Sequence, residues 1–116
     1  MKQRDFTDYL QDILDAVNNI EEFVDDMSFE QFVKDKKTLH AVVRNIEIIG
    51  EASKNIPDSV KAKYKELPWK KMTGMRDKLI HGYFGVDVET LWKAVKENIP
   101  PLKKSIQKML KDQEKR

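Results

Sequence analysis

The sequence has no cysteine, only two histidines and no long apolar run. Without cysteine, the chain can form neither a disulfide nor a thiolate metal site, which suits a reducing cytoplasm. Two histidines without an HExxH-like spacing would leave a metal site dependent on carboxylates, so we predict no metal and no cofactor. No apolar run approaches the roughly 20 residues that cross a bilayer, and the opening MKQRDFTDYL lacks the apolar region of a signal peptide. We therefore expect a cytoplasmic protein without a membrane segment.

Glycine is scarce as well, and so is excess charge of either sign. Three of the four glycines lie at positions 74, 82 and 85, so helix breakers are few in the first half of the chain. The formal net charge of +2 is not the broad basic field of a non-specific nucleic-acid binder, so any RNA-binding residues must be concentrated locally. The length of 116 residues fits one domain. We expect a single domain over 1–116 with a frayed polar tail at 111–116.

Apolar residues recur at spacings of three and four along the first half of the chain, which is typical of amphipathic helices. One such stripe predicts a helix over roughly 4–25. Ser28 and Gln31 have the spacing of a capping box, which predicts that a second helix begins there. Its apolar positions continue to about Asn55, and Pro57 ends it.

The second half also has a helical pattern. A short helix follows Pro57, and the segment over 69–81 predicts a helix of about three turns that the next glycines end. Asp87 is the expected N-cap of the last helix, which Pro100–Pro101 should kink or split. Together these patterns predict an all-α, up-and-down bundle of four to five helices with mostly short connections.

Four polar residues of the second predicted helix, His40, Arg44, Glu47 and Glu51, are spaced by four, three and four. This spacing gathers them on one stripe, while the other faces carry apolar residues. One interpretation is a solvated face on which Arg44 and Glu47 form an ion pair worth roughly 0.2–0.5 kcal/mol. The other interpretation is the wall of a polar cleft. The spacing alone leaves both open.

The segment RDKLIHGY places an arginine, a histidine and a tyrosine close together before a glycine-bearing turn. On a continuous helix Arg76 and His81 would point about 140° apart, since each residue turns the helix by about 100°. They can converge if the helix loosens at Gly82, or across a two-fold axis where two copies supply two of each. The alternative is structural, because basic side chains favour the carboxyl end of a helix.

The same segment matches the Rx4HxY motif, and the chain resembles the HepT toxins, a branch of the HEPN superfamily of ribonucleases. Arg76, His81 and Tyr83 match the arginine, histidine and tyrosine of the motif, and Asp77 falls where a polar residue usually follows the arginine. The resemblance covers essentially the whole chain, through the segments RNIEIIGEASKNIP at 44–57, PWKKMTGMRDKLIHGYFGVD at 68–87 and LWKAVKENIPPLKK at 91–104.

This resemblance implies an HEPN-like helical bundle that forms a homodimer, so that two motifs face one cleft. It implies a toxin that cleaves RNA, with tRNA as the expected target, without a metal ion. It also implies a protein partner, an MntA-type minimal nucleotidyltransferase antitoxin, which uses ATP to attach AMP to the motif tyrosine. A larger hetero-oligomer with that antitoxin is compatible with the resemblance.

On this interpretation each motif residue has a role. Histidine suits proton transfer near neutral pH, so His81 would move protons in RNA cleavage. The guanidinium of Arg76 would hold the scissile phosphate. Asp77 would orient His81 or Arg76, although an exposed helix carboxylate is an equal alternative. Tyr83 would accept AMP, and its alternative role is that of a packed core ring.

Residues around the motif have weaker assignments. Lys70, Lys71 and Lys78 would contact the RNA backbone, or they serve only solubility. The polar stripe residues Arg44, Glu47 and Glu51 would support the motif or the dimer interface. Two other classes of protein stay open, namely a non-catalytic HEPN module that serves as a scaffold for a nucleotidyltransferase, and a plain helical adaptor. The second of these leaves the motif unexplained.

Overall fold

The computed structural model describes residues 5–74 and 87–114, and every regular element in these ranges is a helix. Residues 69–74 are helical as well. The other elements are α1 (Phe6–Phe23), α2 (Phe29–Lys34), α3 (Lys36–Lys54), α4 (Asp58–Lys63), α6 (Val88–Lys93), the π-helix η1 (Ala94–Asn98) and α7 (Ile99–Glu114). The prediction of an all-α bundle is confirmed.

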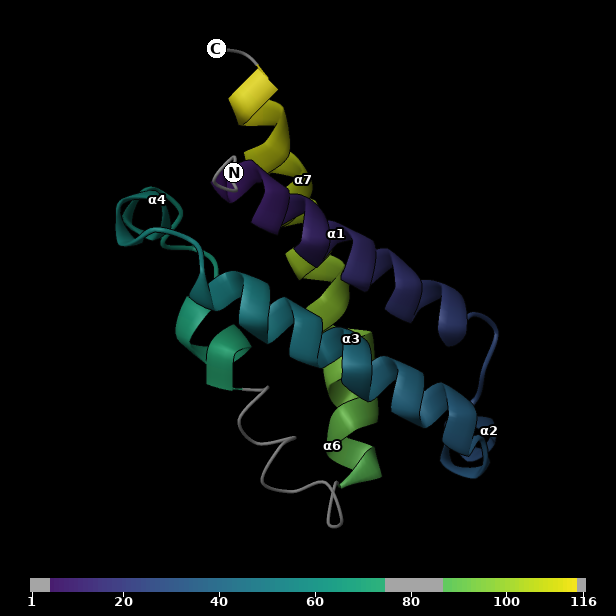
Figure 1. The fold of residues 1–116 in the computed structure, drawn as a ribbon. Coiled ribbons are helices and arrows are strands. Elements are labelled where there is room, and N and C mark those ends of the chain that lie inside the picture. The colour runs from purple at the N-terminus through teal and green to yellow at the C-terminus, as the bar shows by residue number, and fades with distance from the viewer. Residues whose placement is uncertain (1–4, 75–86, 115–116) are drawn as a thin grey trace, which may run out of the picture.

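The bundle is built on the pairing of α1 with α3, which lie side by side, and α7 crosses behind them and packs against α1 (Figure 1). The apolar stripe expected for the first helix is buried, since Leu10, Ile13, Val17 and Ile20 are all inaccessible to solvent. Much of the remaining core comes from α3 and α7, which bury the apolar residues Val42, Ile46, Ile106 and Met109. Periodicity alone therefore identified the helix faces that form the core.

The expected capping box at the start of α2 is present. The backbone N–H of Gln31 donates to the Ser28 hydroxyl at 3.1 Å, and the backbone N–H of Ser28 donates to the Gln31 side-chain oxygen at 2.9 Å. The two bonds satisfy donors that the first turn of a helix leaves unpaired. They set the start of the helix at Phe29.

The second predicted helix is in fact two helices, and a continuous helix to Asn55 was wrong. Asp35 separates α2 from α3 with φ −101° and ψ 87°, which are not helical angles. Its carboxylate accepts from the Thr38 backbone N–H at 3.0 Å and from the Thr38 hydroxyl at 2.8 Å, and so caps α3. This local cap competes with helix continuation, because a short acidic side chain satisfies the backbone better at an N-cap than inside a helix.

The last helical stretch is irregular next to its prolines, as expected. Pro100 and Pro101 lie in the first turn of α7, and the five residues before α7 form the π-helix η1. Neither proline has an N–H to donate to the carbonyl four residues earlier, so the regular ladder cannot continue through this point. The wider π turn joins α6 to α7 and lets the chain run on in nearly the same direction (Figure 1).

In the ranges that the structure describes, no helix has the length and apolar character needed to cross a membrane.

Candidate functional site

The motif residues that were expected to carry the chemistry lie outside the described residues. These are Arg76, Asp77, Lys78, His81 and Tyr83. The structure describes the chain on both sides of them, up to residue 74 and from residue 87 onward.

The upstream flank is a helical segment over 69–74 that two buried side chains anchor to the core. Trp69 is 9% exposed, and its indole N–H donates to the Tyr64 carbonyl at 3.0 Å. The Tyr64 hydroxyl in turn donates to the Asp112 carboxylate on α7 at 2.9 Å. Met72 is buried one turn after Trp69. The chain therefore enters the motif from a helical turn that is fixed to the core and linked to α7.

The downstream flank is the start of α6, where Asp87 is the N-cap as predicted. The Asp87 carboxylate accepts from the Thr90 hydroxyl at 2.7 Å and from the Glu89 backbone N–H at 3.1 Å. The hydrogen bond from the Thr90 side chain is the main cause that lowers the pKa of Asp87 from 3.8, and desolvation opposes it. Leu91 then buries the first turn of α6 against the core.

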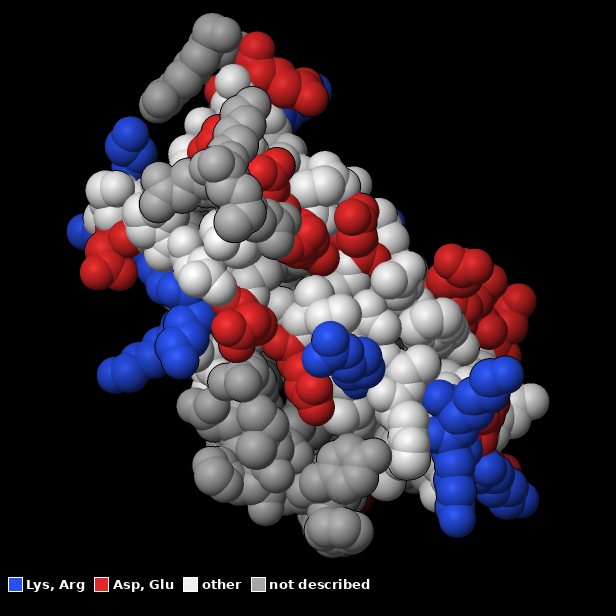
Figure 2. Space-filling view, in the orientation of Figure 1, with Lys and Arg blue, Asp and Glu red and all other residues white. Residues whose placement is uncertain are grey.

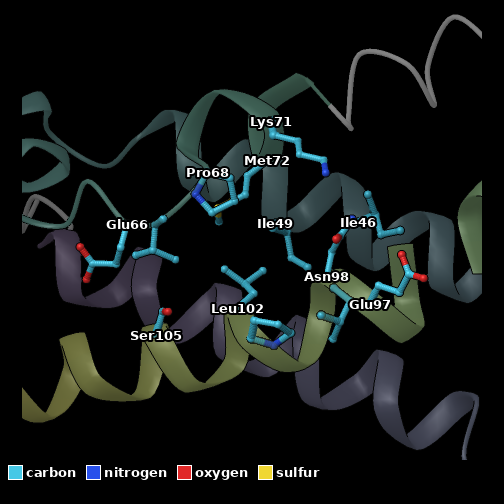
Figure 3. Close-up of a pocket in the computed structure, with 13 residues that line it drawn as sticks. Ile46, Ile49, Glu66, Pro68, Lys71, Met72, Glu97, Asn98, Leu102 and Ser105 are labelled. Carbon is cyan, nitrogen blue, oxygen red and sulfur yellow. The ribbon is translucent and has the colours of Figure 1, made fainter. Parts of the chain in front are cut away.

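The upstream flank meets η1, which follows α6, at a hollow of about 190 Å³ over the middle of α3 (Figure 3). Lys71 and Met72 line it from the upstream flank, and Asn98 lines it from η1. Its floor is apolar and includes Ile46 and Ile49 of α3. The fold therefore places Lys71 and Met72, which precede the motif segment, beside η1, which follows α6.

The predicted polar stripe lines a second hollow, of about 350 Å³, between α3 and α1. Arg44, Glu47 and Glu51 line it from α3, and Tyr9 and Asp12 complete it from α1. Its three carboxylates and one guanidinium give this hollow an excess of negative charge. In Figure 2 acidic side chains dominate the part of the surface over α1 and the middle of α3.

The ion pair between Arg44 and Glu47 is also present, with 3.3 Å between Arg44 Nη1 and Glu47 Oε2. The Arg44 side chain is 71% exposed, so the pair is screened by solvent and contributes little to stability. The structure thus contains both the ion pair and the polar hollow that the spacing left open. His40, the fourth residue of the stripe, is exposed and is not among the residues that line the hollow.

The lysines before the motif are at the surface. Lys70 and Lys71 are both exposed on the turn over 69–74, and Lys71 lines the hollow over α3. Their contact with RNA stays a prediction. Within residues 5–74 and 87–114, no group of three or more histidine or acidic side chains is arranged to hold a metal ion.

Sequence reasoning missed the contribution of α1 to the polar hollow. By spacing, Tyr9 belongs to the apolar stripe of the first helix and Asp12 to its polar face, yet both line the hollow with Arg44. The available signal was their spacing, since residues three apart lie side by side on a helix. That spacing does not indicate which other helix they face, because helix pairing is a tertiary property.

The motif segment and its flanks fall within one continuous family match. The model of the HepT-like ribonuclease family matches residues 13–109. The chain belongs to the HepT-like ribonuclease family. The family recognised from the motif and its three segments is therefore confirmed, and membership supports a ribonuclease activity in general terms.

HepT-like relatives match this chain over nearly their whole length. A protein named "Probable ribonuclease HepT" from Thermococcus cleftensis is 57% identical over 94% of this chain and 99% of its own. Two further relatives have names that describe them as candidate RNases. One, from Methanocaldococcus jannaschii, is 46% identical over 98% of each chain, and one, from Caldanaerobacter subterraneus subsp. tengcongensis, is 46% identical over 88% of this chain and 91% of its own. No solved structure matches the HepT-like chain.

Proposed function

We propose that this chain is the toxin of a toxin–antitoxin pair, an endoribonuclease that cleaves RNA, with tRNA as its target, without a metal ion. The observation that carries the proposal is the HepT-like family match over residues 13–109, which spans the Rx4HxY segment. Relatives named as ribonucleases or RNases match 94% and 98% of this chain, so the match to them is not confined to the motif segment.

Arg76 and His81 supply what RNA cleavage needs from a protein. The ribose 2′-hydroxyl attacks the adjacent phosphorus, and the bond from phosphorus to the 5′-oxygen breaks. A base removes the proton of the 2′-hydroxyl, and an acid protonates the leaving 5′-oxygen. Imidazole suits both roles near neutral pH. Arg76 neutralises the charge that develops on the phosphorane oxygens.

A homodimer completes the site, because one cleft then contains two His81 side chains. One acts as the base and the other as the acid, so the proton removed is balanced by the proton delivered. Asp77 orients these side chains. The hollow lined by Arg44, Glu47 and Glu51 lies between two core helices, and on this proposal its charged groups support the motif or the dimer interface.

Tyr83 is the proposed point of control. The nucleotidyltransferase partner joins the tyrosine oxygen to the α-phosphorus of ATP, and pyrophosphate leaves. The attached AMP adds bulk and a negative phosphodiester only seven residues from Arg76 in the sequence. It therefore competes with RNA for the same cation. Lys70, Lys71 and Lys78 contribute backbone contacts that make RNA binding sensitive to salt.

The chemistry of the fragment ends tests the proposed reaction. The purified, unmodified chain is incubated with a tRNA pool in EDTA, and both ends of each fragment are mapped. We expect 5′-hydroxyl ends together with 2′,3′-cyclic or 3′-phosphate ends. Fragments with 5′-phosphate ends would contradict transesterification. An unmodified dimer that binds RNA but does not cleave it would indicate the non-catalytic HEPN module instead.

A further inference from the structure

The solvent-facing side of α7 is basic, although the net charge of the chain is only +2. Residues 99–111 contain four lysines and no acidic residue, whereas residues 5–33 contain nine acidic residues and no lysine or arginine. Lys104, Lys108 and Lys111 are exposed. They are spaced by four and three, so they follow one another along a single face of the helix. We call this row of three residues the lysine ridge.

The cations of the lysine ridge are not used inside the fold. The remaining lysine of α7, Lys103, lies 2.8 Å from the Glu21 carboxylate of α1. Among the described residues, no carboxylate forms an ion pair with any lysine of the ridge. Like charges three and four residues apart destabilise a helix modestly, and only Lys111 is near enough to the carboxyl end to gain from the helix dipole. Helix stability therefore does not explain the row.

The lysine ridge lies on the opposite side of α7 from the core. The buried residues of α7 are Ile99, Leu102, Ile106 and Met109. In Figure 1, α7 crosses behind α1 and α3 and packs against α1. The ridge is therefore on the side of the molecule turned away from α1, where Figure 2 shows acidic side chains. An anionic partner is attracted to one side of the protein and repelled from the other.

The composition of this face indicates which class of anion it suits. The large exposed apolar side chains among the described residues are Phe23, Phe29 and Val33, and none of them belongs to α7. The ridge thus lacks the apolar anchor of a protein interface, and it has no apolar face to insert into a membrane. Residues 99–114 also contain no aromatic ring on which an unstacked base could stack. A row of cations alone suits a phosphate backbone.

The ridge lies beside the surface that we propose contacts RNA. Ser105, the residue after Lys104, lines the hollow over α3, and Lys71 lines the same hollow from the opposite side (Figure 3). Lys71 is one of the lysines assigned to the RNA backbone, and it precedes Arg76 by five residues in the sequence. An RNA that contacts Lys71 therefore meets the lysine ridge on the other side of a single hollow.

We propose that the lysine ridge binds the phosphate backbone of a double-stranded RNA stem and so holds a folded substrate on the protein. This inference rests on the proposed function, because it takes RNA as the substrate. Proteins recognise A-form stems mostly through shape, phosphates and 2′-hydroxyls, so the ridge needs no group that reads a base. A folded RNA with stems is then bound more tightly than a single strand of the same length.

Neutralising the ridge tests the proposal without disturbing the core. The triple variant Lys104→Gln, Lys108→Gln, Lys111→Gln is compared with the control Lys34→Gln, Lys36→Gln, Lys37→Gln, which removes three exposed charges at the junction of α2 and α3. Fluorescence anisotropy measures binding to a 2′-O-methyl RNA hairpin at several salt concentrations. This probe lacks the attacking hydroxyl and cannot be cleaved by transesterification. A 2′-O-methyl single strand that cannot fold is the second probe.

The ridge variant should lose affinity for the hairpin by about tenfold or more, while the control variant stays within about twofold of the unaltered chain. The slope of log affinity against log salt concentration should fall in magnitude by about 2 to 3, since each lost phosphate contact removes roughly 0.9. Affinity for the single strand should change by less than about threefold, because the ridge has no ring for its bases. Thermal unfolding should show that both variants are folded.

Several outcomes would overturn the proposal. These are unchanged hairpin binding by the ridge variant, equal weakening by both variants, equal loss for the hairpin and the single strand, and no hairpin binding by the unaltered chain. Weaker binding to anionic lipid vesicles with unchanged hairpin binding would assign the ridge to a membrane surface instead. If the ridge variant alone loses the hairpin but even the unaltered chain cleaves no tRNA, the ridge stands and the proposed function fails. If the ridge variant binds and cleaves as the unaltered chain does, the proposed function stands and the ridge fails.

Discussion

Single residues decide the chemistry proposed for this chain, because it has few groups that can transfer a proton near neutral pH. His40 and His81 are its only histidines, and the structure places His40 at the surface of α3, outside both hollows. The motif residues themselves were identified by resemblance. Spacing alone left Arg76 and His81 about 140° apart on a helix, and it did not distinguish a site from a capped helix end.

Tyr83→Phe should separate toxicity from its control. The substitution removes the oxygen that we propose as the AMP acceptor and keeps the ring, so we expect RNA cleavage within about threefold of the unaltered chain. The partner and ATP should then no longer inhibit cleavage. Mass spectrometry of the two proteins after incubation with partner and ATP measures the adduct. An AMP adduct of equal yield on the variant would place the modification on another residue.

Glu47→Gln distinguishes the two interpretations of the polar stripe. The ion pair with Arg44 is exposed, so its loss should change the free energy of unfolding by less than about 0.5 kcal/mol. If the carboxylate supports the motif, as we propose, RNA cleavage should fall at least fivefold in the same variant. Denaturant unfolding and initial cleavage rates measure the two effects. An unchanged rate would leave Glu47 as part of a solvated face.

At the scale of helices, local side chains determine where each helix begins and ends, and tertiary packing determines which of its faces is buried. Ser28 and Asp87 were predicted as N-caps, and both cap their helices, because capping depends on residues only two or three positions away. The break at Asp35 was missed although an equally local cap causes it. Its cap on Thr38 is a local signal, and the apolar periodicity that continues on both sides of it concealed the break.

Asp35 also makes the start of α3 sensitive to acid. The backbone and side-chain hydrogen bonds from Thr38 lower the pKa of Asp35 from 3.8 in the folded chain. A lowered folded pKa gives stability that is present above the unfolded value of 3.8 and is lost as the pH falls through the folded value. Asp35→Asn keeps a capping side chain but cannot titrate. We expect the free energy of unfolding of this variant to change less between about pH 2 and about pH 5 than that of the unaltered chain, because its side chain does not titrate. Denaturant unfolding across this range measures the difference. An identical profile for both proteins would contradict this role.

At the scale of the molecule, the sequence predicted more of the fold than of the site. The apolar stripes identified the core faces of α1, α3 and α7, because burial follows helical periodicity. They could not show that Tyr9 and Asp12 complete a hollow with Arg44, since that depends on how α1 crosses α3. Nor could they show that residues 69–74 and η1 meet over Ile46 and Ile49. Both arrangements arise from tertiary packing between distant segments.

The central claim is that Arg76 and His81 cleave RNA without a metal ion. It is tested most directly by initial cleavage rates on tRNA in EDTA for the unaltered chain, Arg76→Ala, His81→Ala and the matched control His40→Ala. We predict that the two motif substitutions each lower the rate by at least about 100-fold, the lower range for a general acid–base group, while His40→Ala stays near the unaltered rate. Cleavage by His81→Ala at the unaltered rate would contradict the claim.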